Sequence, residues 1–133
     1  MITPRQELSS RIAAEARRLG FAAIGFAPAG PARSLSIFQE WIACGFAASM
    51  DYLRRNQQLR ANPVDLAPGA RTVIVTAAGY PSNPEPGKGF STYCRGQDYH
   101  TVLRRQLREL VRFIRTLTPV SVARVCVDSA PVL

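Results

Sequence analysis

Lysine and histidine are nearly missing from this sequence. Lys88 is the only lysine and His100 the only histidine among 133 residues. A single histidine excludes a multi-histidine metal site, and it gives no basis for a Ser-His-Asp triad. Cysteine is also scarce: Cys44, Cys94 and Cys126 stand far apart without a CxxC pair, which excludes a zinc or iron–sulfur ligand set within these residues. We expect free, buried thiols in a reducing compartment.

Long apolar runs are missing too. No uninterrupted apolar stretch approaches the roughly 18 residues that a membrane helix needs, and the N-terminus lacks the basic-then-apolar pattern of a secretory signal. The hydrophobic fraction of 47% and the charged fraction of 20% are typical of a soluble globular protein. The sequence therefore predicts a cytoplasmic protein without membrane attachment, folded as a single domain over residues 1–133.

Acidic side chains are few, at 9 against 17 cationic ones, which gives a net charge of +8. Because all but one of the cations are arginines, phosphate groups are favoured partners and nucleic acid is a candidate. GC-rich coding DNA explains the preference for arginine over lysine equally well. A helical stripe of Arg105, Arg108, Arg112 and Arg115 is either a solvated face or a contact with an RNA backbone.

The apolar periodicity and the turn signals predict helices alternating with strands. A capping box of Thr3 and Gln6 begins the first helix and Gly20 ends it, whereas Ser34 is expected to cap the second helix and Gly45 to end it. The predicted elements are a helix over 3–19, a buried strand over 21–27, a helix over 34–44, a short helix over 51–58, a strand over 72–77, a long loop over 79–92, a helix over 98–117 and a strand over 120–127. This order is typical of an α/β (α+β) fold, and we predict a three-layer sandwich fragment.

Asp128 is the strongest single candidate for chemistry. It follows the predicted strand over 120–127, and the carboxyl ends of strands in α/β sheets are where ligand crevices open. A carboxyl group beside Val125 and Val127 would lose hydration, which raises its pKa and suits a proton donor. The alternative is that Asp128 caps the turn over residues 129–131 through its side chain.

Two further places could bind a ligand. Asp98, Tyr99 and His100 begin the long helix, within a polar, aromatic and cationic run over residues 93–100 that can grip a large planar or anionic ligand. The structural alternative is a helix cap followed by a lone histidine. Arg60 begins an irregular stretch, where it either holds a phosphate or amide group or is simply solvated.

Two motifs stand out when the segments are read together: Gly96-Gln97-Asp98-Tyr99-His100 and Val127-Asp128-Ser129-Ala130-Pro131. With them, the chain resembles the N-terminal part of epoxyqueuosine reductases, which act in the last step of queuosine synthesis in tRNA. The resemblance covers essentially the whole chain in order and spacing. Its other pieces are Leu19-Gly20-Phe21, Ile24-Gly25-Phe26, Met50-Asp51-Tyr52-Leu53, Arg60-Ala61-Asn62-Pro63, Leu66-Ala67-Pro68-Gly69-Ala70 and Ala78-Gly79-Tyr80-Pro81.

The resemblance implies an oxidoreductase that uses cobalamin and two [4Fe–4S] clusters. Its implied reaction reduces the epoxide of epoxyqueuosine, at the tRNA wobble position, to the alkene of queuosine. Its implied architecture is similar to that of reductive dehalogenases. It also implies roles for six residues: Asp128 as proton donor beside the cobalamin, Asp98, Tyr99 and His100 in the substrate pocket, and Arg60 and Ser91 as cobalamin contacts.

The chain departs from the family in two respects. It stops at Leu133, before the family's later cobalamin-contacting segments, its cysteine-rich cluster domain and its tRNA-binding repeats, so we expect the chain alone to be inactive. Thr92-Tyr93-Cys94 stands where many relatives have Arg-Tyr-Ala, which changes a position for which the resemblance implies a contact with substrate. Two other functions remain open: a stand-alone corrinoid-binding module and a basic RNA-binding domain.

Overall fold

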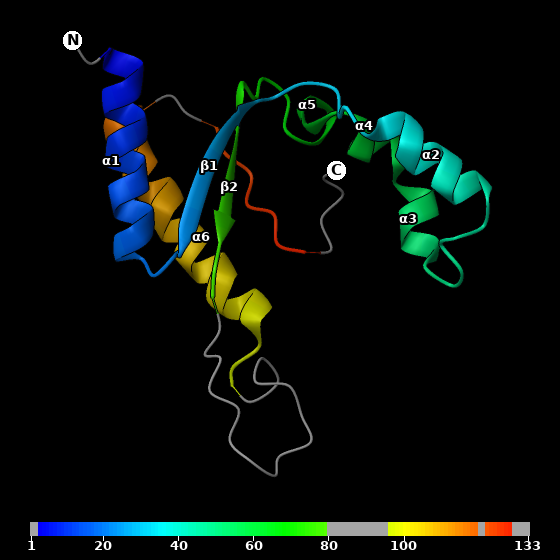
Figure 1. Ribbon diagram of the computed structural model, residues 1–133. Helices are drawn as coiled ribbons and strands as arrows, with labels where there is room; N and C mark the ends of the chain where they lie inside the picture. Colours follow the sequence, from blue (N-terminus) through cyan, green and yellow to red (C-terminus); the bar gives the residue numbers. More distant parts are fainter. Residues whose placement is uncertain (1–2, 80–95, 120–121, 129–133) are drawn as a thin grey trace. The chain divides into compact units, whose positions relative to one another are not determined.

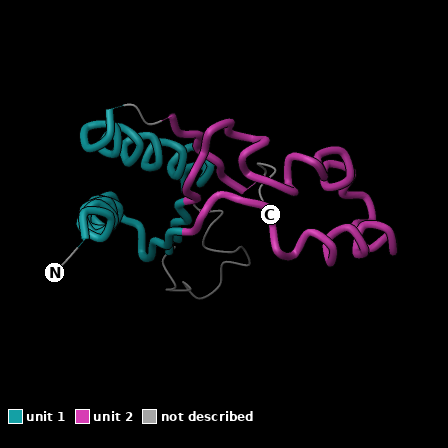
Figure 2. Tube along the Cα trace, turned by 90° about the horizontal axis from the view of Figure 1, so that it is seen from above, with its two compact units in different colours: residues 1–26, 74–121 teal, residues 27–73, 122–133 magenta. Residues whose placement is uncertain are grey.

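The computed structural model describes residues 3–79, 96–119 and 122–128. It divides the chain into two compact units (Figure 2). Unit 1 comprises residues 1–26 and 74–121, and unit 2 comprises residues 27–73 and 122–133. Each unit has helices of its own, and the sites described below lie within one unit or the other.

Two long helices form the body of unit 1. Helices α1 (Pro4–Arg18) and α6 (Tyr99–Leu117) lie side by side (Figure 1). The predicted capping box begins α1: the Thr3 backbone N–H donates to Gln6 Oε1 at 2.8 Å, and the Gln6 backbone N–H donates to Thr3 Oγ1 at 3.3 Å. These bonds satisfy two donors that a helix start leaves without partners.

The core of unit 1 lies between these helices and the strands. Four buried residues form its centre: Ile12, Ala16, Phe21 and Leu110. Ile24 and Ile74, one from each strand, pack against this centre from the sheet. The apolar stripe of α6 therefore faces α1 and the sheet, as the spacing of its leucines predicts.

The sheet of the described residues has two strands, β1 (Ala23–Pro28) and β2 (Thr72–Ala77). The Ala22 N–H donates to the Ala77 carbonyl at 2.8 Å and the Ala29 N–H to the Arg71 carbonyl at 3.0 Å, so the strands run antiparallel. The expected strand over 72–77 is confirmed. The expectation of a buried strand over 21–27 is wrong in its burial, because most of β1 is exposed in the described part of the chain.

Unit 2 is built from short helices. They are α2 (Leu35–Ala43), α3 (Asp51–Arg55), α4 (Gln57–Ala61) and α5 (Pro63–Leu66). Ser34 stands at the expected N-cap position of α2, but its side chain makes no capping hydrogen bond. Gly45 follows α2 with a φ of 78°, a conformation that glycine adopts without steric cost, and this confirms it as the end of the helix. The short helix expected over 51–58 is found as α3 and the start of α4, with Asn56 between them. The sequence did not predict α5, because a helix of a single turn carries no periodic signal.

The strand expected over residues 120–127 is not found. Residues 122–127 form no strand, while residues 120 and 121 lie outside the described part of the chain. An alternating apolar pattern favours an extended chain, but a strand also needs a neighbour for its backbone hydrogen bonds. A side-chain hydrogen bond connects this segment to the end of α5: Arg124 Nη1 donates to the Leu66 carbonyl at 3.1 Å.

The mixed helix and strand class is confirmed, and the antiparallel pairing makes it α+β. The described residues of unit 1 account for two layers, a helix pair on a sheet; a third layer and the likeness to reductive dehalogenases stay predictions. The loop expected over 79–92 falls, apart from Gly79, outside the described residues. None of the helices in the described ranges has the length and apolar character needed to span a membrane.

Candidate functional site

Arg60 is the one buried charged residue in the described part of the chain. It lies in the last turn of α4, and only 6% of its surface is exposed. Its Nε is buried and has no hydrogen-bond partner among the described residues. No described carboxylate forms an ion pair with it either. A buried guanidinium costs free energy unless an acceptor compensates it, so this position calls for an acceptor from outside these residues.

The short helices of unit 2 explain why Arg60 is held in place. Its backbone N–H donates to the Asn56 carbonyl at 3.1 Å, and the Asn62 side chain caps the following helix by accepting from the Val64 N–H at 3.1 Å. The chain turns sharply at Asn62, so α4 packs against both α5 and α2. Arg60 is therefore fixed within a compact group of elements, and the alternative of a simply solvated arginine is wrong.

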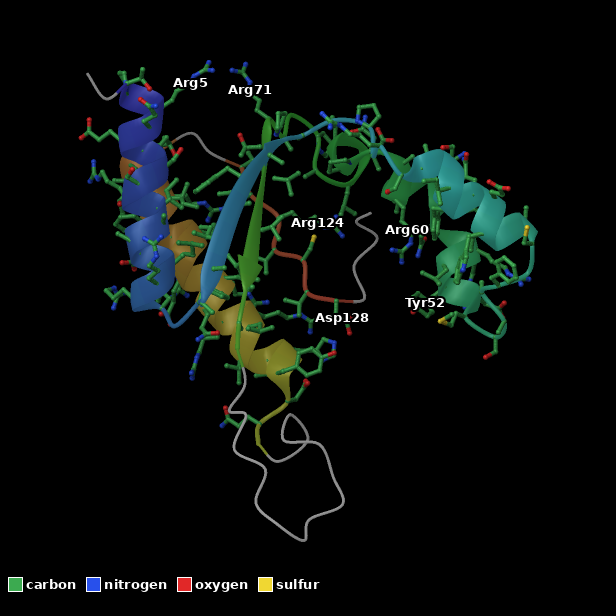
Figure 3. All side chains as sticks on the ribbon, viewed as in Figure 1. Arg5, Tyr52, Arg60, Arg71, Arg124 and Asp128 are labelled. Carbon is green, nitrogen blue, oxygen red and sulfur yellow. The ribbon has the colours of Figure 1, made fainter. Side chains whose placement is uncertain are left out.

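An aromatic ring faces the same guanidinium. Arg60 Cζ lies 6.0 Å from the centroid of the Tyr52 ring, at the outer limit of a cation–π contact (Figure 3). Tyr52 belongs to α3 and is half exposed, and its hydroxyl lies 3.8 Å from the Met50 sulfur. The sequence analysis assigned no role to Tyr52, which belongs to the helix just before α4.

Asp98, Tyr99 and His100 form a second group at the start of α6. The Asp98 carboxylate accepts from the His100 backbone N–H at 3.1 Å, which confirms the expected helix cap. His100 Nδ1 lies 2.9 Å from the same oxygen, and because a carboxylate can only accept, Nδ1 carries the proton in this pair. The Tyr99 and His100 rings stack with their centroids 4.1 Å apart. The three residues thus make one hydrogen-bonded and stacked group.

The hydrogen bonds of this group act on the Asp98 charge. The side-chain bond from His100, followed by the bond from the His100 backbone, lowers the pKa of Asp98 below its usual value. Asp98 remains 60% exposed. This carboxylate is therefore an anchor that holds the His100 ring and the helix start, rather than a group that keeps a proton.

Asp128 lies in unit 2 and is exposed in the described chain. Its φ of 48° places it in the left-handed region, which aspartate enters more readily than most residues. Val127 beside it is buried and Val125 is half-buried, as expected. The carboxyl group of Asp128 is not shielded from water by the described residues, and the strand expected to precede it is not formed. The expected loss of hydration is therefore not seen in the described part of the chain. Its role as proton donor stays a prediction.

The structure brings some of the candidate residues together and leaves others apart. Asp98, Tyr99 and His100 contact one another in unit 1, whereas Arg60 contacts Tyr52 in unit 2. Ser91 lies outside the described residues, so its expected cobalamin contact is untested.

Cysteine plays no visible part in either group. Cys44 is exposed, contrary to the expectation of buried thiols, and Cys126 is half-buried. Cys94 lies outside the described part of the chain.

With this geometry in place, the chain can be compared with known proteins. The profile of the family described as "Epoxyqueuosine reductase QueG, DUF1730" matches residues 60–129, more than half of the chain. An epoxyqueuosine reductase of Aliivibrio fischeri is 34% identical over 137 aligned positions, which cover 96% of this chain and 37% of that protein. The chain thus spans about 37% of the length of the curated relatives it matches.

Solved structures agree in fold. The chain matches a crystal structure of an epoxyqueuosine reductase with an epoxyqueuosine-modified tRNA stem loop at a TM-score of 0.82 and 22% identity, over 96% of this chain and 36% of that one. It matches the Bacillus subtilis epoxyqueuosine reductase, with an aspartate-bearing catalytic loop swung out of the active site, at a TM-score of 0.61 and 27% identity, over 83% and 32%. The fold and the family profile give one answer: the chain belongs to the epoxyqueuosine reductase family and corresponds to its DUF1730 region and the segment before it.

Proposed function

We propose that this chain forms the N-terminal part of an enzyme that reduces epoxyqueuosine in tRNA to queuosine. The observation that carries the proposal is the 34% identity with an epoxyqueuosine reductase over 96% of the chain. In this assignment residues 1–133 are one wall of a pocket that the rest of the protein completes. The chain alone would then be inactive, since it spans about 37% of its relatives.

Cobalamin is the cofactor that the family resemblance implies, and the buried Arg60 supports it. Arg60 Nε is buried without an acceptor among the described residues. Cobalamin carries amide and phosphate oxygens, which are the acceptors that a guanidinium prefers. We assign Arg60 and, from the family resemblance, Ser91 and Asp128 to this cofactor. Two [4Fe–4S] clusters would be held by protein outside these residues.

The overall reaction sets the requirement for an acid. Converting an epoxide to an alkene breaks both carbon–oxygen bonds to the same oxygen, consumes two electrons and two protons, and releases water. Cobalamin and the clusters, when bound, would supply the reducing chemistry. The chain's own contribution is a proton for the departing oxygen, which we assign to Asp128.

The conformation of Asp128 suits a group on a turn that changes position. The Bacillus subtilis relative has a catalytic aspartate loop swung out of its active site. Asp128 lies in a left-handed conformation and is exposed in the described chain. Exclusion of water around it would then come from bound cofactor and substrate, or from protein beyond these residues.

Asp98, Tyr99 and His100 are assigned to the substrate pocket. The Asp98 bond fixes the His100 ring through Nδ1, so Nε2 is the acceptor nitrogen of the neutral ring. The stacked Tyr99 ring offers a flat surface to a nucleobase. The partner we propose is therefore a tRNA carrying epoxyqueuosine, met in the cytoplasm.

Turnover of modified tRNA tests the function. The protein, expressed with all residues that its gene encodes, would be reduced anaerobically and incubated with tRNA containing epoxyqueuosine. Mass spectrometry of the digested nucleosides should show loss of one oxygen atom with formation of queuosine. The 133-residue chain under the same conditions should give none. Absence of queuosine with the cobalamin- and cluster-loaded protein would refute the proposal.

Cobalamin titration tests the assignment of Arg60. Replacing Arg60 with methionine keeps much of the volume but removes the donor, so we expect the affinity for cobalamin to fall at least about tenfold. The melting temperature of the cofactor-free protein should not fall, because an uncompensated buried charge is removed. The exposed Arg54→Met is the matched control and should leave the corrin absorption titration unchanged. Equal affinities of wild type and Arg60→Met would show that Arg60 does not contact the cofactor.

A further inference from the structure

Arginines make up five of the eight exposed residues of α6. Arg104 joins the stripe expected from the sequence, and all of its members are exposed. We call this set the α6 arginine face: Arg104, Arg105, Arg108, Arg112 and Arg115. With 3.6 residues per turn the five fall within an arc of about 100° around the helix, and they extend along about 17 Å of its axis.

The charges of this face are not neutralised by neighbouring acids. None of its five arginines has an ion pair with a described residue. Glu109, the one acidic residue of α6, is half-buried and interacts with Arg18 of α1. The face is therefore a concentrated positive surface on one side of α6, and the opposite side of this helix packs in the core of unit 1.

The packing of α6 decides what kind of partner the face can take. Its apolar stripe, which includes Leu103, Leu107 and Leu110, is packed in the core of unit 1. A helix that binds a membrane surface needs its apolar side available to lipid, so that use is excluded. The other exposed residues of the helix are Tyr99, Thr101 and Thr116, so the face has no aliphatic side chain to form the centre of a protein interface.

We propose that the α6 arginine face binds the phosphate backbone of an RNA. Arg104, Arg108 and Arg112 follow one another at intervals of four residues, so their backbone positions are spaced by about 6 Å along the helix axis. Guanidinium groups bind phosphate oxygens through paired hydrogen bonds, and such contacts set the position of a nucleic acid without reading its sequence. The inference rests on the proposed function, in which the RNA is the tRNA substrate.

Salt-dependent binding to an unmodified anticodon stem loop tests the proposal, because that probe carries no epoxide and needs no turnover. The cofactor-loaded, complete protein would be compared with a triple variant, Arg104→Gln, Arg108→Gln and Arg112→Gln, by fluorescence anisotropy. Affinity should fall at least about tenfold, and the slope of log affinity against log salt should decrease in magnitude by about two to three.

A charge-matched control separates the face from net charge. Arg5, Arg11 and Arg17 are exposed on α1 in the same unit, but they are spread around that helix. Replacing these three with glutamine removes as much charge and should change affinity no more than about twofold. Equal losses in the two triple variants, or no loss in the α6 variant, would overturn the proposal. So would competition by polyglutamate as effective as that by RNA of equal charge.

The same variants keep this inference distinct from the proposed function. Corrin absorption should be unchanged in both, since neither set includes a residue assigned to the cofactor. Queuosine formation by the wild type together with unchanged RNA affinity of the α6 variant would refute the arginine face alone. Loss of RNA affinity in that variant without queuosine formation by the wild type would refute the proposed function alone.

Discussion

At the scale of single residues, burial and backbone conformation single out Arg60 and Asp128. Arg60 is a buried cation with an unpaired donor among the described residues, and Asp128 is a non-glycine residue in a left-handed turn. The sequence identified both positions through motifs. It could not predict the burial of Arg60, because side-chain burial is set by the packing of α4 against α2 and α5.

The pH dependence of stability tests the anchoring role of Asp98. Its pKa is lowered in the folded chain by the His100 side-chain bond and then by the backbone bond. A depressed carboxyl pKa contributes stability that is present above its unfolded pKa of about 3.9 and is lost as pH falls through the lower folded value. Asp98→Asn keeps a capping oxygen but has no charge. The wild type should therefore melt higher than the variant at neutral pH, and the difference should shrink on acidification below about pH 4. A difference in melting temperature that is constant with pH would contradict this role.

At the scale of elements, local signals predicted most of the fold. The capping box at Thr3, the strand Thr72–Ala77 and the apolar stripe of α6 each depend on residues close together in the chain, and the structure has all three. The strand expected over 120–127 failed because strand formation depends on a distant partner. Arg104 was missed in the arginine stripe although its spacing fits, so a fuller helical projection would have found it.

The junction of α1 and α6 gives a test at this scale. Gly20 follows α1 with a φ of 95°, and a Cβ there would lie 3.3 Å from Gln106 Nε2, which itself donates to the Leu19 carbonyl at 2.7 Å. Gly20→Ala should lower the free energy of unfolding by about 1–2 kcal/mol because of the left-handed backbone. Gly30, with open space around its Cβ position, is the control, and Gly30→Ala should change it by less than about 0.5 kcal/mol. Urea unfolding measures both, and equal losses would show that the Gly20 turn carries no special constraint.

At the scale of the whole molecule, the described residues contain a small core. The buried apolar residues are Ile12, Ala16, Phe21, Ala47, Leu66, Leu110 and Val127, and four of them belong to the centre of unit 1. Composition predicted a globular protein. Which residues are buried in each unit could not be predicted, because burial depends on tertiary contacts that the sequence does not show. We propose that the rest of the protein adds to this core, as the longer relatives suggest.

Truncation of Leu110 measures how much the unit 1 core contributes to stability. It is 2% exposed, and it packs with Ile12, Ala16 and Phe21. Leu110→Ala should lower the free energy of unfolding by about 2–5 kcal/mol, through lost apolar burial and the cavity left behind. The exposed Ile37→Ala is the control, with an expected change below about 0.5 kcal/mol in urea unfolding. Core truncations are expected to cost about 2–5 kcal/mol. A loss of less than about 1 kcal/mol in Leu110→Ala would mean that this core does not hold unit 1 together.

The most direct measurement is the rate at which Asp128→Asn converts epoxyqueuosine to queuosine in tRNA. Asparagine tolerates the left-handed conformation at this position, so the turn should be kept while the acidic proton is lost. With cobalamin bound as in the wild type, turnover should fall by at least about a hundredfold, the lower end for loss of a general acid. Turnover within a few-fold of the wild type would contradict the account and leave Asp128 as the residue of a turn.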